Sequence, residues 1–90
     1  MNERRYTIRL SSRELMYLKN TNFLPESLAR VIETAQLVDD GCTIYILREL
    51  AEQFRSVFTD QMARVGFNAD YDPTSEGKML EELIDRFYLA

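Results

Sequence analysis

Histidine is absent from the sequence, and this absence excludes more chemistry than any other feature of the composition. Histidine supplies the base of most nucleophilic triads, many general acids and bases, and a ligand in many zinc sites. The three glycines are scattered singly, so no glycine-rich phosphate loop is present. Carboxylates, tyrosines and lysines remain, but none stands in a spacing typical of a catalytic or metal site. We therefore expect a protein that is not an enzyme and that needs no metal or other cofactor.

Cysteine and long apolar runs are also scarce. Cys42 is the only cysteine and cannot form an internal disulfide, which fits a reducing compartment. We expect its thiol to fill a small buried space beside the second predicted strand. No apolar run approaches the roughly 18 to 20 residues that span a bilayer, and residues 1–5 lead into strand-like sequence without the apolar core of a signal peptide. These features predict a cytoplasmic protein without a membrane segment.

The chain of 90 residues has room for one domain with a single core. Its content of 46% apolar and 11% aromatic residues is that of a folded chain rather than a disordered one. We therefore expect residues 1–90 to form a single small domain.

The most regular stretch of the chain covers residues 43–66. Five strand-like residues at 43–47 pass without a break into a run whose apolar residues recur at steps of three and four, the pattern of a helix that buries one side. Gly66 follows the last apolar residue, so we expect it to close the helix in the left-handed conformation. The recurring apolar residues are Leu47, Leu50, Ala51, Phe54, Val57, Phe58, Met62 and Val65.

The N-terminal part of the chain predicts a strand followed by two short helices. Residues 5–10 alternate between apolar and polar side chains, as in a strand with one buried face. Ser11 and Glu14 have capping-box spacing and predict a helix that ends near Asn20. Pro25 suits the first position of the second helix. The residues expected on the buried sides are Tyr6, Ile8 and Leu10 in the strand, Leu15, Met16 and Leu18 in the first helix, and Leu24, Leu28, Val31, Ile32 and Ala35 in the second.

Two connecting segments carry turn signals. Asp39, Asp40 and Gly41 predict a tight turn before the second strand. In residues 67–73, we expect the aromatic side chains to hold a surface loop against the core. Acidic or amide residues at every second position resemble the start of a calcium loop, but Pro73 stands where that loop needs glycine and Met79 where it needs glutamate.

The last predicted helix has one wide apolar side and one acidic side. Thr74 or Asp72 is expected to cap it, and Gly77 in its first turn permits close approach to a neighbouring element. Glu82 and Arg86 are four residues apart in the order that favours an ion pair. The apolar side consists of Met79, Leu80, Leu83, Ile84, Phe87 and Tyr88, and the acidic side of Glu76, Glu81, Glu82 and Asp85.

These elements predict an α+β fold with two short strands packed under about four helices. Residues 7–15 and 43–50 resemble one another, and each strand is followed by two helices, so the plan is either a strand-helix-helix pseudo-repeat or a chance similarity between two junctions. Paired strands would place Ile8 and Leu10 on the same face as Ile44 and Ile46. Because two strands alone make a marginal sheet, either the helices cover it well or a second copy extends it in a homodimer by strand pairing.

Two stretches resemble known proteins. The segments FRSVFTD, RVGFNADYDPTSEG and LEELIDRF, within residues 54–87, resemble a C-terminal pattern of short uncharacterised bacterial proteins, a resemblance that implies no activity. The first 38 residues are similar to a ribbon-helix-helix repressor, with Arg5, Thr7 and Arg9 on the outward face of the strand. In that family the outward strand residues of a dimer enter the major groove, so this resemblance implies a DNA-binding transcriptional regulator. The acidic balance of the chain departs from the basic face that nucleic acid requires.

Charge favours a different function. The net charge is -4, and residues 68–90 hold six acids against two bases, whereas residues 1–30 hold six bases against three acids. Acid-rich faces steer toward basic surfaces, so we expect a small non-catalytic protein-binding module, such as an immunity protein or inhibitor, for a basic partner. The candidate binding residues are Glu81, Glu82 and Asp85, with Arg5, Thr7 and Arg9 as the DNA-binding alternative. An acidic helix that only keeps the protein in solution is the third interpretation.

Overall fold

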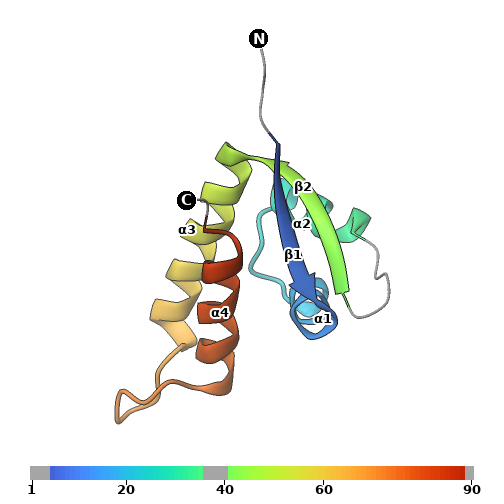
Figure 1. Cartoon of the computed structure of the whole chain (residues 1–90). Helices are drawn as coiled ribbons and strands as arrows, with labels where there is room; N and C mark the ends of the chain where they lie inside the picture. The colour runs from blue at the N-terminus through green and yellow to red at the C-terminus, as the bar shows by residue number, and fades with distance from the viewer. Residues whose placement is uncertain (1–4, 36–40, 89–90) are drawn as a thin grey trace.

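The computed structural model describes residues 5–35 and 41–88. In these residues the order strand-helix-helix occurs twice (Figure 1). The predicted α+β fold with two strands and four helices is therefore confirmed. The elements are β1 (Arg5–Ser11), α1 (Ser12–Asn20), α2 (Glu26–Thr34), β2 (Gly41–Leu47), α3 (Arg48–Val65) and α4 (Ser75–Arg86). Gly41 begins β2, and Asp39 and Asp40, the other residues of the predicted turn, lie outside the described residues.

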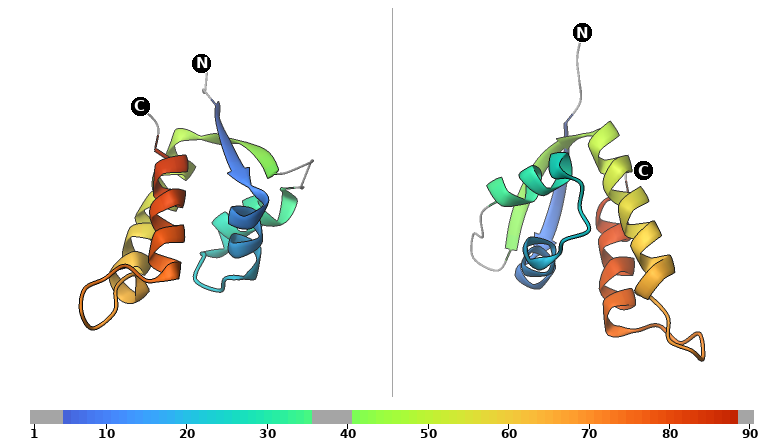
Figure 2. Two further views of the ribbon diagram at one scale, coloured as in Figure 1. Left: turned by 60° about the horizontal axis from the view of Figure 1, so that its bottom comes forward. Right: turned by 180° about the vertical axis from the view of Figure 1, so that it is seen from behind.

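The two strands pair antiparallel and bury one face, as their alternating side chains predict. Ile8 lies opposite Ile44, so equivalent residues of the two resembling segments face one another across the pair. Leu10 lies opposite Cys42, and both are buried together with Ile46. Seen from behind, α2 lies across this buried side of the strands (Figure 2). The other face of the sheet carries the exposed side chains and has no helix over it in Figure 1.

Helix α1 begins at the predicted capping box. The Ser11 hydroxyl accepts a hydrogen bond from the Glu14 N–H (3.1 Å), and the Glu14 carboxylate accepts one from the Ser11 N–H (2.7 Å). Leu15 and Leu18 are buried, but the prediction for Met16 is wrong because 48% of this residue is exposed. Residues three and four apart share a helix face, so the buried side of α1 contains positions 14, 15 and 18, and Glu14 takes the third place.

Helix α2 follows Pro25 at the N-cap instead of containing it, a shift of one residue from the predicted position. The Pro25 carbonyl accepts hydrogen bonds from the N–H groups of Leu28 (3.0 Å) and Ala29 (2.9 Å). Leu28 and Ile32 are fully buried, with Leu24 and Val31 partly buried around them. The predicted inner side of this helix is confirmed.

Helices α3 and α4 form a hairpin around three aromatic rings. Phe54, Phe58 and Phe87 are fully buried, and their ring centroids lie 4.6 to 5.8 Å apart. Aromatic pairs at such distances stabilise a core beyond the area that they bury. Leu80 and Leu83 of α4 are buried in the same core. The predicted apolar sides of both helices are therefore confirmed except at Tyr88, which follows the end of α4 and is 62% exposed.

The hairpin closes through glycine and threonine, but not in the way predicted for Gly66. Gly66 has φ −75°, a right-handed conformation, so the expected left-handed closure is wrong. Its carbonyl instead accepts a hydrogen bond from the Thr74 N–H (2.8 Å), and the Thr74 hydroxyl bonds the Val65 carbonyl (2.8 Å) while it caps α4 at the Gly77 N–H (2.9 Å). A Cβ on Gly77 would lie 2.2 Å from the Gly66 carbonyl oxygen. The close approach predicted for Gly77 is confirmed, and its neighbour is Gly66.

Replacement of Phe58 by alanine is expected to lower the free energy of unfolding by about 3 to 5 kcal/mol, because it removes a fully buried ring from the cluster with Phe54 and Phe87. Urea denaturation of the variant and the wild type measures this difference. A loss below about 1 kcal/mol would show that the ring cluster does not support the core.

Candidate functional site

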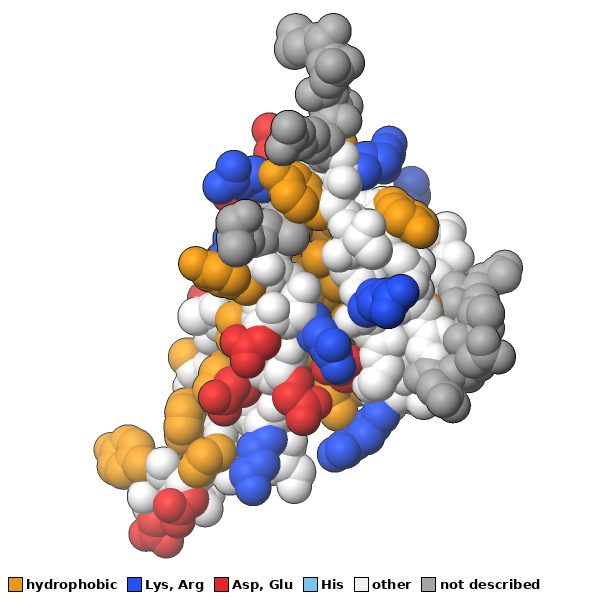
Figure 3. Space-filling view, viewed as in Figure 1, with side chains coloured by type: hydrophobic (Ala, Val, Ile, Leu, Met, Phe, Trp, Pro, Cys, Tyr) orange, Lys and Arg blue, Asp and Glu red, His pale blue; other side chains and the backbone are white. Residues whose placement is uncertain are grey.

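The three acids predicted to bind a partner are exposed on α4. Glu81 and Glu82 are neighbours, and Asp85 follows Glu81 by four residues, about one helical turn. Figure 3 shows acidic side chains gathered over α4 on the face of the molecule that Figure 1 presents. The side of the helix that meets α3 is committed to the core, so this patch does not contribute apolar packing.

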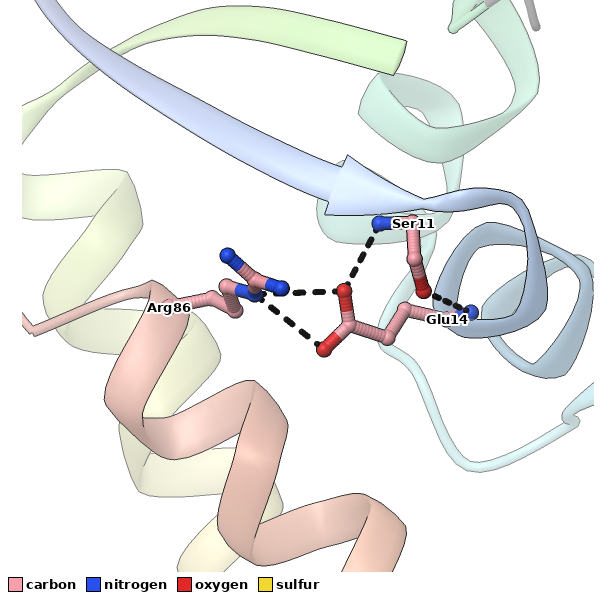
Figure 4. A network of polar contacts seen from close by, with 3 residues as sticks. All are labelled: Ser11, Glu14 and Arg86. Carbon is pink, nitrogen blue, oxygen red and sulfur yellow. Dashed lines mark hydrogen bonds and ion pairs between the residues drawn. The ribbon is translucent and has the colours of Figure 1, made fainter. Parts of the chain in front are cut away.

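Arg86 binds Glu14 instead of the acid four residues before it. Its Nε lies 3.3 Å from each carboxylate oxygen of Glu14 (Figure 4). Glu14 is only 2% exposed, and a buried carboxylate is costly without a partner, so it competes better for the guanidinium than an exposed acid does. Within the described residues, Glu81, Glu82 and Asp85 form no ion pair.

A second polar contact joins the same two helices. The Tyr17 hydroxyl donates a hydrogen bond to Glu76 Oε2 (2.6 Å). Burial raises the pKa of Tyr17 well above its ordinary value, and the hydrogen bond to the Glu76 carboxylate and its charge raise it further. Tyr17 therefore stays protonated and acts as a donor. No sequence signal connects positions 17 and 76, which lie in different halves of the chain.

A hollow on the surface runs along the α1–α4 boundary beside the ion pair. Arg13 of α1 contributes a positive charge to it, next to Glu82 and Asp85 of α4. The acidic patch is therefore bordered by arginine on the side of α1. The residues that line the hollow are Ser11, Arg13, Glu14, Glu82, Asp85 and Arg86.

The outward face of the sheet is basic and contains no acid. Arg5, Thr7 and Arg9 are exposed, as predicted, and Tyr45, opposite Thr7 on β2, is 63% exposed. No aspartate or glutamate occurs in Arg5–Ser11 or Gly41–Leu47. Figure 3 shows basic side chains over these strands on the same side of the molecule as the acids of α4. One face thus presents both signs of charge.

The loop between α3 and α4 does not pack on the core, and this prediction is wrong. Phe67 is 47% exposed and Tyr71 is 85% exposed. Polar contacts shape the loop instead, because the Asn68 side-chain oxygen accepts hydrogen bonds from the N–H groups of Asp70 (2.9 Å) and Asp72 (3.1 Å). The amide oxygen that a calcium site would require is thereby used by the backbone.

Because the chain has no histidine, carboxylates and the thiol of Cys42 are the side chains that could bind a metal ion. In residues 5–35 and 41–88, no group of three or more aspartate, glutamate or cysteine side chains is placed to hold a metal ion. Cys42 is buried, as predicted, and burial raises the pKa of its thiol, with opposing effects of Lys19, which lowers it, and Glu14, which raises it. The thiol is therefore protonated and inaccessible, which suits a packing role.

Comparisons of the chain with protein-family models, curated proteins and solved structures gave no match. The resemblance to short bacterial proteins and the similarity to ribbon-helix-helix repressors therefore remain predictions from the sequence. None of the described helices combines the length and the apolar content that crossing a bilayer requires.

The ion pair between Glu14 and Arg86 is expected to stabilise the fold more than a surface pair does. A double-mutant cycle with Glu14→Gln and Arg86→Met should give a coupling free energy of about 1 to 2 kcal/mol by urea denaturation, because Glu14 is buried although half of the Arg86 side chain is exposed. The exposed pair of Glu26 and Arg30 on α2 is the matched control and should give about 0.3 to 0.5 kcal/mol. Equal coupling in the two cycles would contradict the structural role of Glu14.

Proposed function

We propose that the protein is a small non-catalytic protein-binding module, of the immunity or inhibitor type, whose α4 acids dock on a basic partner protein. The observation that carries the proposal is that Glu81, Glu82 and Asp85 are exposed without an ion pair among the described residues, while the arginine of the same helix is held by Glu14. Their negative charge is therefore available to a partner.

The spacing of these acids favours a role in binding over a role in folding. Glu81 and Asp85 carry like charges at four-residue spacing, which destabilises a helix by a few tenths of a kcal/mol. Exposed charges at an interface mainly raise the rate of association with an oppositely charged surface and fix its orientation. A basic partner would remove the repulsion, because its lysines or arginines would lie between the carboxylates.

The mixed charge of the face favours a protein over nucleic acid. Acidic side chains over α4 and basic side chains over the strands lie on one side of the molecule (Figure 3). A nucleic acid that approached the strands would bring its phosphates toward the acids of α4, which repel them. A protein surface can present both signs and complement both parts of the face.

We also propose that the protein acts in the cytoplasm, because its one thiol is buried and forms no disulfide.

The sheet has two strands in the described residues, so each strand has one edge without a strand partner. We propose a homodimer in which these edges pair. The molar mass of the purified protein in solution, measured by light scattering, tests this assembly.

Replacement of Glu81, Glu82 and Asp85 together by glutamine, glutamine and asparagine is expected to abolish capture of the partner. The wild type and the variant are used as bait in extracts of the native host at low and moderate salt, and captured proteins are identified by mass spectrometry. The wild type should retain a basic protein that the variant loses, and moderate salt should weaken this capture. Thermal unfolding should remain within a few degrees of the wild type, because exposed acids contribute little.

The matched control for this experiment changes the same number of acids elsewhere. Glu33→Gln, Glu49→Gln and Asp60→Asn remove three exposed carboxylates from α2 and α3 and change the net charge equally. This control should capture the same basic protein as the wild type. If the α4 variant captures it equally well, α4 is only a solvated helix and the proposal fails.

DNA binding is the second candidate function, favoured by the acid-free outward face of the sheet. An antiparallel two-stranded ribbon fits the major groove, and Arg5, Thr7 and Arg9 would face the bases or phosphates. Ribbon-helix-helix repressors bind in this way with one strand from each subunit, whereas here both strands belong to one chain.

Replacement of Arg5 and Arg9 by glutamine is expected to leave folding and binding nearly unchanged, because exposed charges on a solvated sheet contribute little. Electrophoretic mobility shifts with duplex DNA at several salt concentrations measure the effect for the wild type and the double variant. DNA binding by the wild type that falls steeply with salt and disappears in the double variant would establish the second candidate.

A further inference from the structure

We infer that the α3–α4 loop at residues 67–73 is a rigid aromatic anchor that inserts Tyr71 into an apolar pocket with a basic rim on a partner protein. The loop extends beyond the ends of the two helices in every view (Figures 1 and 2). This surface differs from the acidic patch, which begins at Glu81, about 9 Å along α4 from its first residue. The inference therefore does not depend on the acids of α4.

The loop exposes two aromatic side chains to solvent. Tyr71 is 85% exposed, more than any other large apolar residue that the structure describes, and Phe67 in the same loop is 47% exposed. Apolar rings in water contribute nothing to a fold, whereas tyrosine is among the residues that supply most of the binding energy at protein interfaces. Its ring fills a pocket while its hydroxyl finds a hydrogen-bond partner.

The backbone of Tyr71 is held in an unusual conformation. Its φ is 64°, and it is the only described residue other than glycine with a positive φ. Bulky residues rarely adopt this conformation, which persists only where the surrounding contacts impose it. Here Asn68 imposes it: the Tyr71 N–H donates to the Asn68 carbonyl (2.9 Å), and the Asn68 N–H donates to the Asp72 carbonyl (3.0 Å).

The base of the loop is fixed as well. Phe67 and Pro73 form an antiparallel bridge, and Thr74 joins the ends of α3 and α4 through its backbone and side chain. A binding element that is already ordered loses less conformational entropy when it binds. The loop thus holds an exposed ring in the position from which it can bind.

The charges of the loop indicate which class of partner it binds. Asp70 and Asp72 flank Tyr71 and are exposed, and residues 67–74 contain no lysine or arginine. Two carboxylates beside the ring repel the phosphates of nucleic acid and of anionic lipid. They match lysine or arginine at the rim of a pocket, so the partner is a protein with an apolar pocket and a basic rim.

The test uses a photo-crosslinking amino acid at Ala69, which is exposed in the loop and leaves Tyr71 in place. The same amino acid at Thr43, exposed on the outward face of the sheet, is the matched control. Irradiation in the native host should give an adduct with a host protein from position 69 that position 43 does not give. The host protein is then purified, and its Kd for each variant of the full chain is measured.

Four substitutions test the ring of Tyr71 independently of the Asn68 hydrogen bonds that shape the loop. Tyr71→Asn removes the ring but keeps a residue that accepts positive φ, and it should raise the Kd at least tenfold, whereas Tyr45→Asn on the sheet should change it less than twofold. Asn68→Ala removes the acceptor that shapes the loop and should raise the Kd, while Asn68→Asp keeps an acceptor oxygen and should restore it. Thermal unfolding of each variant establishes that it is folded.

Three results would overturn the inference: no adduct specific to position 69, an adduct only with lipid or with a second copy of this chain, or a Kd for Tyr71→Asn within twofold of the wild type. The α4 triple variant is measured in parallel. A partner that is lost with the α4 variant but kept by Tyr71→Asn rejects the anchor and leaves the proposed function standing. A partner lost with Tyr71→Asn alone supports the anchor and rejects the acidic patch.

Discussion

The buried carboxylate of Glu14 is the constraint on which much of the structure depends. It caps α1 at its start, and it holds Arg86 at the opposite end of the chain. A carboxylate removed from water needs hydrogen bonds and a positive charge, and both are provided here by residues 3 and 72 positions away. Glu82, four residues before Arg86, therefore lacks the ion pair that its spacing would allow. A local helix cap thus takes up the arginine that could have neutralised an acid on a distant surface.

The α3–α4 hairpin is joined to the rest of the fold by the shared apolar core and by two polar contacts between α1 and α4. The α3–α4 hairpin has its own aromatic core, and α1 and α2 pack under the sheet. Where α1 meets α4, the contacts are the ion pair of Glu14 with Arg86 and the hydrogen bond of Tyr17 with Glu76. Polar contacts depend on geometry more strictly than apolar packing does, so these two constrain how α4 lies against α1. They thereby help to set where the acidic patch lies relative to the face of the sheet.

Local patterns in the sequence predict most of the fold. Alternation in β1, three-and-four spacing in α3 and α4, and the capping box of Ser11 and Glu14 each depend on residues close together in the chain, and each is confirmed. The exposed positions of Glu81, Glu82 and Asp85 follow from the same spacing. Periodicity fails at Met16, which it assigns to the core because the residue is apolar, and it gives no sign that the capping residue Glu14 is buried.

Contacts between distant residues, and loop conformations, could not be predicted in this way. Nothing near Arg86 in the sequence indicates that it binds Glu14 and not Glu82. The sequence predicts that Phe67 and Tyr71 hold a surface loop against the core, but both rings are exposed and the hydrogen bonds of Asn68 shape the loop instead. Gly66 carries the common signal for left-handed closure, yet it is right-handed, and the missing side chain of Gly77 lets α4 approach the Gly66 backbone. Each of these outcomes depends on three-dimensional neighbours.

The register of the sheet has a consequence for synthesis of the chain. Ile8 pairs with Ile44, so β1 has no partner until roughly 36 more residues have been made, which takes on the order of 2 to 7 seconds at about 5 to 20 residues per second. During this interval Ile8 and Leu10 lie in an unpaired apolar strand, the kind of segment that aggregates. Arg5 and Arg9 alternate with these residues, and charges so placed oppose strand association between nascent chains. The same arginines that face solvent in the finished sheet therefore protect the strand before the sheet exists.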